Sequence, residues 1–518
     1  SGTDSIVASF NAHALASGME CLILGGSATL GYGNSGNNTL VAGASGSSLV
    51  GNGGVDSLFG GAGGDTLVAG SGSDMLDGGA GNDSLVGGSG NDYYFLDSTS
   101  DTIVESAGSD VDSVLATVGG YSLANNVEWL IFGTGATSGT GNANANTLVG
   151  SSSNDTLDGG AGIDSLSGGT GNDLYLLDNL SDIISEGAIA GTDSVLASVS
   201  GYTLADHIEY LGLSGIVVQG TGNSLNNTLR GNASGNSLDG DSGDDTLIGE
   251  SGNDTLIGGS GNDSMVGGAD DDYYMIDSSS DAVVEAASGG TDSVLATFSG
   301  FTLSSEVEWL ILDTGVANGF GSASANTILG NTEANSLSGG GGNDSLYGGA
   351  GADTLDGGAD IDTMVGGTES DYYLVGSVSD TVVESGGEGT DSVYATIGNY
   401  ILGENVEHLE LGTGIIAGSG NIGNETLLGN AIGNSLSGAS GNDTLLGLAG
   451  NDTLDGGSGD DSLVGGEGSD LYYLDSMSDV IIEVSNQGTD SVLASISGYT
   501  LASQVEYLEL LDGALSGT

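Results

Sequence analysis

Residues 78–86 read GGAGNDSLV, and their pattern, G-G-x-G-x-D-x-L-x, recurs along the whole chain. Residues 258–266 read GGSGNDSMV, and residues 456–464 read GGSGDDSLV. A short repeat of fixed period is the signature of a solenoid, because one unit can bury its apolar face only by stacking on its neighbours. We count 29 such units in five runs, at residues 33–95, 141–176, 222–275, 321–374 and 420–473.

Each nonapeptide has the composition of a tight turn followed by a short strand. Gly at the first, second and fourth places permits the positive φ angles of a tight turn. The last three places alternate about one inward apolar residue at the eighth place, so the seventh and ninth places point outward. The sequence therefore predicts an all-β chain, a parallel β-roll or β-solenoid with two units per turn. Tyr takes the eighth place in the last unit of every run, which we interpret as a wider core there: Tyr94, Tyr175, Tyr274, Tyr373 and Tyr472.

A second, longer unit separates the runs and carries D-x-x-x-E, then D-S-V, then V-E-x-L. The Glu of V-E-x-L, or its equivalent, falls at positions that differ by multiples of nine: 20, 128, 209, 308, 407 and 506. We therefore expect the long unit to be about five coils of the same winding. The predicted domains are the five runs, a partial long unit at 1–32, and long units at 96–140, 177–221, 276–320, 375–419 and 474–518.

The charge and composition exclude several classes of protein. The chain has 71 Asp and Glu but one Lys or Arg, for a formal net charge of -70. Nucleic-acid binding and attachment to anionic membranes both need clusters of basic residues. We expect no membrane insertion, because no run of 18 apolar residues occurs, and no signal-peptide pattern opens the chain. The single cysteine, Cys21, cannot form an internal disulfide, so something else must hold a secreted chain of this length.

The nonapeptides resemble the calcium-binding repeats of the RTX (hemolysin-type) family, and 20 of them carry Asp at the sixth place. Together with the long units, the resemblance covers essentially the whole chain. It implies a β-roll with calcium ions between stacked turns, interrupted by calcium-poor 45-residue solenoid segments. It also implies bacterial type I export as an unfolded chain, and folding at a secreted, extracellular or cell-surface location.

Calcium takes six to eight oxygen ligands, and each turn offers carbonyl oxygens and the sixth-place carboxylate. Because alternate units of a run stack, Asp56, Asp74 and Asp92 should form one column, with Asp65 and Asp83 in the other. We expect about ten calcium ions or more. The candidate metal ligands are the 20 sixth-place aspartates: Asp56, Asp65, Asp74, Asp83, Asp92, Asp155, Asp164, Asp173, Asp245, Asp254, Asp263, Asp272, Asp344, Asp353, Asp362, Asp371, Asp443, Asp452, Asp461 and Asp470.

Two points about the ligands stay open. A sixth-place Asp has the alternative role of a simple Asx-turn residue. The long-unit acids, such as Asp101, Glu105, Asp112 and Glu128, are either a second calcium site or turn caps on solvated edges. The units that lack a sixth-place Asp are expected to bind calcium weakly or not at all, and their sixth residues are Asn38, Ser47, Asn146, Asn227, Asn236, Asn326, Asn335, Glu425 and Asn434.

The sequence contains no H-E-x-x-H or G-x-S-x-G motif, and its three histidines lie in separate long units, so we expect no enzyme activity. Our leading hypothesis is a calcium-dependent extracellular structural protein, a rigid rod in a surface layer, filament or adhesin stalk, that self-associates end to end or laterally. The alternatives are the calcium-folded RTX region of a larger secreted enzyme or toxin, and ice binding through the outward Ser and Thr ladder. Neither end shows a capping element, so we expect either a window of a longer array or a unit that stacks on its neighbours.

Overall fold

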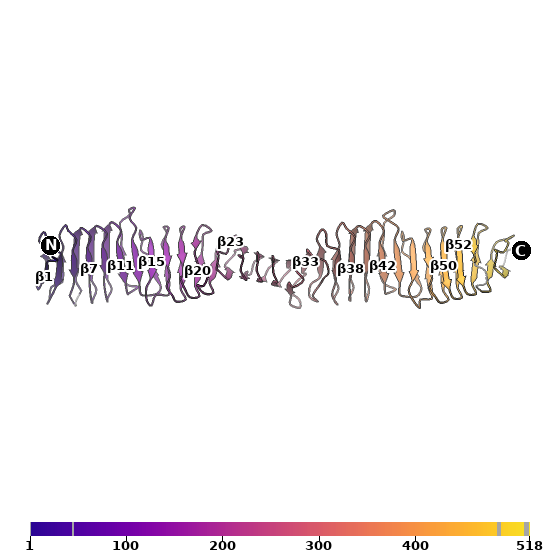
Figure 1. Ribbon diagram of the computed structural model, residues 1–518, viewed down its shortest axis with the longest axis horizontal. Helices are drawn as coiled ribbons and strands as arrows, with labels where there is room; N and C mark the ends of the chain where they lie inside the picture. The colour runs from indigo at the N-terminus through magenta and orange to yellow at the C-terminus, as the bar shows by residue number, and fades with distance from the viewer. Residues whose placement is uncertain (1, 44–45, 484–487, 512–516, 518) are drawn as a thin grey trace. The chain divides into compact units, whose positions relative to one another are not determined.

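The computed structural model describes residues 2–43, 46–483, 488–511 and 517. Within these residues every helix or strand assigned is a β-strand, as predicted, and none of the described chain forms a helix that could cross a membrane. The chain divides into two compact units, Ser1–Ser264 and Met265–Thr518. Each unit is a parallel β-solenoid, in which the strands of each sheet lie side by side along the chain's winding (Figure 1).

In the first unit the strands alternate between two stacks, so each turn of the coil adds one strand to each stack. The first stack contains β1 (Ser5–Ala8), β3 (Cys21–Leu24), β5 (Thr39–Val41), β7 (Ser57–Phe59), β9 (Met75–Asp77), β11 (Tyr93–Leu96), β13 (Ser113–Ala116), β15 (Trp129–Phe132), β17 (Thr147–Val149), β19 (Ser165–Ser167), β21 (Ile183–Ile184), β23 (Tyr202–Thr203), β25 (Gln219–Thr221), β27 (Ser237–Asp239) and β29 (Thr255–Ile257). The second stack contains β2 (His13–Ala14), β4 (Leu30–Tyr32), β6 (Ser48–Gly53), β8 (Thr66–Ser71), β10 (Ser84–Ser89), β12 (Thr102–Val104), β14 (Tyr121–Ser122), β16 (Ser138–Thr140), β18 (Thr156–Asp158), β20 (Leu174–Leu177), β22 (Ser194–Ala197), β24 (Tyr210–Leu213), β26 (Thr228–Arg230) and β28 (Thr246–Ser251).

The second unit is built in the same way, from a third and a fourth stack. The third stack contains β31 (Tyr273–Ile276), β33 (Ser293–Ala296), β35 (Trp309–Leu312), β37 (Thr327–Leu329), β39 (Ser345–Ala350), β41 (Thr363–Thr368), β43 (Thr381–Val383), β45 (Tyr400–Ile401), β47 (Ala417–Ser419), β49 (Ser435–Ser437), β51 (Thr453–Asp455), β53 (Leu471–Leu474), β55 (Ser491–Ala494) and β56 (Tyr507–Leu510). The fourth stack contains β30 (Ser264–Ala269), β32 (Ala282–Val284), β34 (Phe301–Thr302), β36 (Asn318–Phe320), β38 (Ser336–Ser338), β40 (Thr354–Asp356), β42 (Tyr372–Val375), β44 (Ser392–Ala395), β46 (His408–Leu411), β48 (Thr426–Leu428), β50 (Thr444–Ala449), β52 (Ser462–Glu467) and β54 (Val480–Ile482).

The strand register shows why two nonapeptides make one turn. Leu67 in β8 pairs with Leu85 in β10, and Leu58 in β7 pairs with Leu76 in β9, in each case two nonapeptides further on. All four leucines are fully buried, whereas the residues on either side of them are half-buried or exposed. Identical inward side chains therefore stack into a narrow apolar core, with one main buried apolar side chain from each nonapeptide.

The long units keep this winding, as the nine-residue arithmetic predicts. Tyr94 pairs with Val114, and Val114 pairs with Leu130. The first of these coils is two residues longer than a pair of nonapeptides and the next is two residues shorter, so the register is restored. Tyr373 begins the same sequence of offsets in the second unit.

Each long unit interrupts one sheet and leaves the other continuous. In the first unit the sheet breaks between β12 and β14, whereas β11, β13 and β15 pair without a break. At the next long unit the break falls in the opposite stack, between β21 and β23. The reason is that the separation between Glu128 and Glu209 in the sequence is an odd multiple of nine. The long units at 96–140 and 177–221 therefore lie on opposite sides of the coil.

The turns of neighbouring coils lie in direct contact at the edges of each unit. Gly72 and Gly90 have φ angles of 140° and 113°, which L side chains rarely adopt. A Cβ on Gly90 would overlap the carbonyl oxygen of Gly72, one coil away. Glycine is needed there because a side chain would push the coils apart, and the close stacking brings turn carbonyls near the sixth-place carboxylates.

Candidate calcium sites

The sixth-place aspartates line the turn edges in columns. The backbone N–H of Asp56 donates to Oδ1 of Asp74 (2.6 Å), and that of Asp74 donates to Oδ1 of Asp92 (2.7 Å). Asp65 and Asp83 are joined in the same way at 2.7 Å, so the two predicted columns exist. All 20 sixth-place aspartates are buried, with at most 2% of any of them exposed. The same bond joins Asp155 to Asp173, Asp245 to Asp263, Asp344 to Asp362, Asp353 to Asp371, Asp443 to Asp461 and Asp452 to Asp470.

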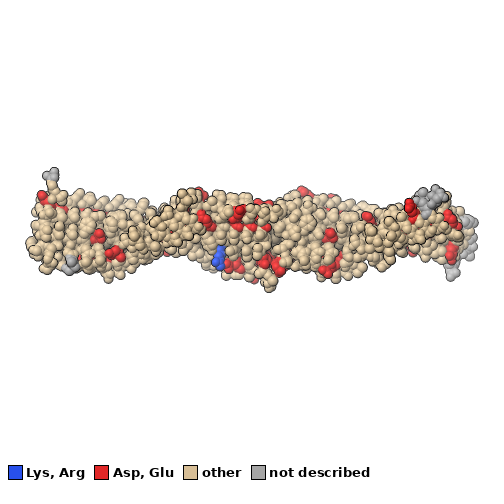
Figure 2. All heavy atoms as spheres, turned by 60° about the horizontal axis from the view of Figure 1, so that its bottom comes forward, with Lys and Arg blue, Asp and Glu red and all other residues tan. Residues whose placement is uncertain are grey.

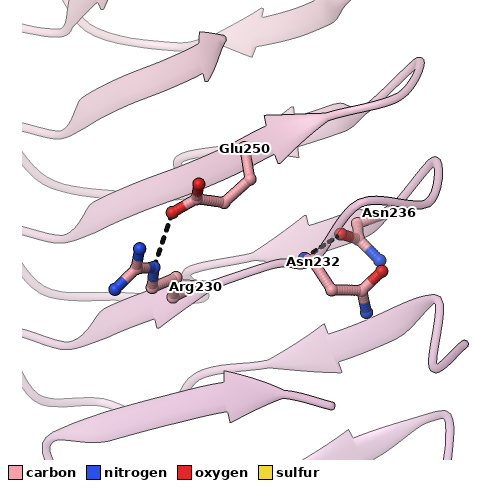
Figure 3. Close-up of polar contacts among 4 residues, drawn as sticks. All are labelled: Arg230, Asn232, Asn236 and Glu250. Atoms are coloured by element: carbon pink, nitrogen blue, oxygen red, sulfur yellow. Dashed lines mark hydrogen bonds and ion pairs between the residues drawn. The ribbon is translucent and has the colours of Figure 1, made fainter. Parts of the chain in front are cut away.

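We call the side chains joined in these columns the ladder carboxylates. Only one oxygen of each accepts the backbone N–H of the preceding coil. In the described part of the chain, the second oxygen of Asp56, Asp74 and Asp92 is buried and has no hydrogen-bond donor. The only Lys or Arg of the protein does not reach them, because Arg230 pairs at the surface with Glu250 at 2.6 Å (Figure 3). An ionised carboxylate with a buried, unpartnered oxygen is unfavourable, so the columns require protons or cations.

The pKa values of the ladder carboxyls show the same need. Burial, assisted by the charge of Asp74, raises the pKa of Asp56 to about 6 against the opposing backbone bond from Asn38. Burial raises the pKa of Asp353 to about 7, and the neighbouring charge of Asp371 adds to the effect. Without metal, these groups are therefore close to their titration points at neutral pH, and a cation that displaces the protons would restore the charged form.

The donor set fits calcium. The edges present carboxylate oxygens from stacked coils and nearby turn carbonyl oxygens, which are the hard ligands that calcium prefers. The sixth-place aspartates of one column would hold the ions together with the turn carbonyls. A bound ion would replace repulsion between stacked acids with a cross-link between coils, and its binding energy would become folding energy.

In the coils with Asn at the sixth place, which we call asparagine coils, the side-chain amide satisfies the turn by hydrogen bonds alone. Oδ1 of Asn236 accepts from the N–H of Asn232 at 2.7 Å (Figure 3), and Nδ2 of Asn236 donates to the carbonyl of Val217 at 2.9 Å. An aspartate could not make the second bond, because an ionised carboxylate has no donor. This supports the expectation that such coils bind calcium weakly or not at all. The same amide-to-carbonyl bond is made by Asn38, Asn146, Asn227, Asn326, Asn335 and Asn434.

The long-unit acids separate into two roles. Asp101 and Asp112 extend the ladders, since they accept from the N–H groups of Asp83 (2.9 Å) and Asp92 (2.7 Å). Glu128 caps its column by accepting from the N–H of Asp112 at 2.9 Å. These bonds make Asp101 and Asp112 continuations of the two columns and Glu128 the end of one of them.

Glu105 belongs to neither ladder and instead accepts a hydrogen bond from the hydroxyl of Tyr94. The eighth-place tyrosine therefore does more than widen the core. Sequence reasoning missed this contact, although a Glu follows the eighth-place Tyr at the end of each run at a constant spacing, as with Tyr373 and Glu384. That constant spacing is the signal that could have shown it.

Substitution of Asp353 by Asn is expected to remove at least one bound calcium ion. The asparagine can still accept from the N–H of Asn335, but it loses the charge and the unpartnered oxygen. An ion present at 100 times its Kd contributes about 2.7 kcal/mol to folding, so a loss of that order is expected. Calorimetric titration and denaturant unfolding at fixed calcium would measure both effects. Asp360→Asn, at an exposed turn position of the next unit, is the matched control, and an equal loss there would contradict a site-specific role.

Comparison with known families agrees with this geometry. The profile of the RTX calcium-binding nonapeptide repeat (4 copies) matches stretches that together cover about half of the 518 residues: 32–67, 68–103, 140–175, 221–256, 239–274, 320–355, 347–382 and 437–472. A search of curated proteins finds no match.

Proposed function

Since this chain belongs to the RTX calcium-binding nonapeptide repeat family, we propose that it is a calcium-dependent extracellular structural protein, a scaffold in a surface layer, filament or adhesin stalk. One observation carries the proposal: buried carboxylate ladders recur in every run. The repeated element is therefore the working part of the molecule.

Calcium dependence links this architecture to location. Ions that bind only the folded chain add their binding energy to folding, and each one at 100 times its Kd adds about 2.7 kcal/mol. In calcium-poor cytosol the acids of a chain with net charge -70 repel one another and favour expansion. Outside the cell calcium is plentiful. Type I export as an unfolded chain, followed by folding outside, fits this difference and the properties of RTX repeats.

We further propose that this chain is not an enzyme. Acid–base catalysis needs titratable groups whose environments push their pKa values apart. Here the sixth-place aspartates repeat in similar surroundings, as with Asp56 and Asp353, whose pKa values are raised to about 6 and about 7 by the same cause.

Self-association is the third part of the proposal. The residue after the V-E glutamate faces outward in each long unit, and its aromatic side chains are exposed at Trp129 (39%), Trp309 (37%) and Tyr507 (62%). Exposed aromatic groups are enriched where proteins meet other proteins. The face in Figure 2 carries its Asp and Glu in separate patches with uncharged surface between them. Such surface supports contacts between copies that do not oppose acids directly.

Electron microscopy of native material, before and after calcium chelation, tests the proposed role. We expect ordered filaments or sheets that dissolve on chelation and return when calcium is restored. Magnesium at equal ionic strength is the control, because it demands octahedral geometry and keeps its water ligands. Separate particles that each end in a compact globule would overturn the structural role and favour the RTX region of a larger secreted enzyme or toxin.

A further inference from the structure

The end of each nonapeptide run gathers three carboxylates in one place. Oxygens of Asp371, Glu384 and Asp391 all lie within 4.8 Å of one another, and all three residues are buried. Ordinary ladder positions bring together only the equivalent acids of stacked coils. We call this arrangement the junction cluster. The described residues contain five such clusters: Asp92, Glu105 and Asp112; Asp173, Glu186 and Asp193; Asp272, Glu285 and Asp292; Asp371, Glu384 and Asp391; and Asp470, Glu483 and Asp490.

The long coil of the register shift assembles the cluster. Asp371 stands before β42 and Asp391 before β44, and the N–H of Asp371 donates to Oδ1 of Asp391 at 2.8 Å across the lengthened coil. Glu384 follows β43 and enters from the chain between these strands. Its backbone carbonyl accepts from Nδ2 of Asn405 at 3.0 Å, and its Oε1 accepts from the hydroxyl of Tyr373. The glutamate is therefore held at both its backbone and its side chain.

The remaining oxygens of the cluster are placed to bind a cation. Oδ2 of Asp371 and Oε2 of Glu384 are buried and, in the described residues, receive no hydrogen bond. The exposed fractions of the two residues are only 2% and 8%. A Cβ on Gly366 would overlap both Oδ2 of Asp371 and the hydroxyl of Tyr373, so these groups converge over one α-carbon. Glycine there leaves room that the acids line.

The electrostatics support the same conclusion. Burial raises the pKa of Glu384 to about 7, against the bond from Tyr373 and with help from the charges of Asp391 and Asp371. Burial likewise raises the pKa of Asp371 to about 6. Three close acids without a basic neighbour cannot all ionise unless a cation joins them. Because every atom that could bind the metal is an oxygen, a hard divalent ion of the calcium type fits, and a metal that prefers nitrogen or sulfur ligands does not.

We propose that the junction clusters are a second class of calcium site, which clamps the last nonapeptide coil of a run to the long unit that follows. The proposal rests on the calcium dependence proposed above but not on the structural role. Each ion would join two coils through the two aspartates and fix the intervening chain through the glutamate. The clusters at Asp92 and Asp173 lie before strands of opposite stacks, so successive clamps in the first unit act on opposite edges.

Terbium tests this proposal in the full chain, because Tb³⁺ enters oxygen-rich calcium sites and emits when a nearby phenol is excited. We expect Tyr373→Phe to lower tyrosine-sensitised emission, since the hydroxyl of Tyr373 lies against the cluster, while the other tyrosines still sensitise the remaining ions. Tyr372→Phe, at the outward-facing neighbour, is the matched control and should change little. Equal losses in the two variants would overturn the proposal.

Calcium counting by equilibrium dialysis provides the second readout. Glu384→Gln keeps the side-chain volume and should bind one ion fewer, while a variant with Gln at Glu105, Glu186, Glu285, Glu384 and Glu483 should bind five fewer. An unchanged count in Glu384→Gln would show that the clusters hold protons and would overturn the inference, even if the five-fold variant does not fold. The unsubstituted chain could fail to fold on addition of calcium while Glu384→Gln still binds one ion fewer than it does. That result would contradict the proposed function but support the junction site.

Discussion

Removal of calcium at neutral pH is expected to unfold most of the chain. The buried oxygens of the ladder aspartates would lose their counter-ions, and the stacked acids would repel one another across coils that bury mainly one apolar side chain per nonapeptide. The far-ultraviolet circular dichroism of the β-structure should disappear. The radius of gyration measured by X-ray scattering should approach or exceed about 85 Å, the scaling value for an unfolded chain of this length.

Calcium should reverse the change cooperatively, and magnesium should not. The asparagine coils, such as the one closed by Asn236, are too short to remain folded alone, because each run contains at most two of them before aspartates resume. If the chelated chain keeps the circular dichroism and the scattering curve of the calcium-loaded protein, calcium binds to the fold without stabilising it.

Acidification of the calcium-free chain is expected to restore β-structure. The folded-state pKa of Asp56 is raised to about 6 and those of Asp92 and Asp112 to about 7, chiefly by burial. The same groups in an unfolded chain titrate near about 3.9. A group with a raised folded-state pKa stabilises the fold fully below its unfolded pKa, and this stabilisation is lost as the pH rises through the folded value. Protons should therefore replace calcium near pH 4, and the fold should be lost between about pH 4 and 7.

Circular dichroism of the dialysed, calcium-free protein from neutral pH down to about pH 4 measures this effect. With saturating calcium the β-signal should stay high throughout the neutral range, because ions then hold the carboxylates. Ultracentrifugation is needed as a control, since loss of net charge also favours association. A monomeric chain that stays disordered at the acid end would contradict the assignment of the buried acids as the groups that oppose folding.

Most of the architecture could be predicted from spacing alone. The alternation in Asp83-Ser84-Leu85-Val86 indicates an inward Leu85, and the turn of two nonapeptides places Asp56, Asp74 and Asp92 in one column. The structure confirms both. The multiples of nine between the V-E glutamates likewise predict that the long units keep the winding, which the offsets after Tyr94 confirm.

The sequence by itself thus determined the coil, its period and the columns of acids, because a strictly repeated pattern forces equivalent residues to stack. Only the tertiary structure decided what happens where the period is broken. The lengthened coil after Asp371 brings Glu384 to Tyr373 and to the carboxylates, and the amide of Asn236 reaches the carbonyl of Val217 in the preceding coil. Side-chain direction in these places depends on how extra residues are accommodated and on which backbone groups the adjoining coil leaves free, and spacing carries no information about either.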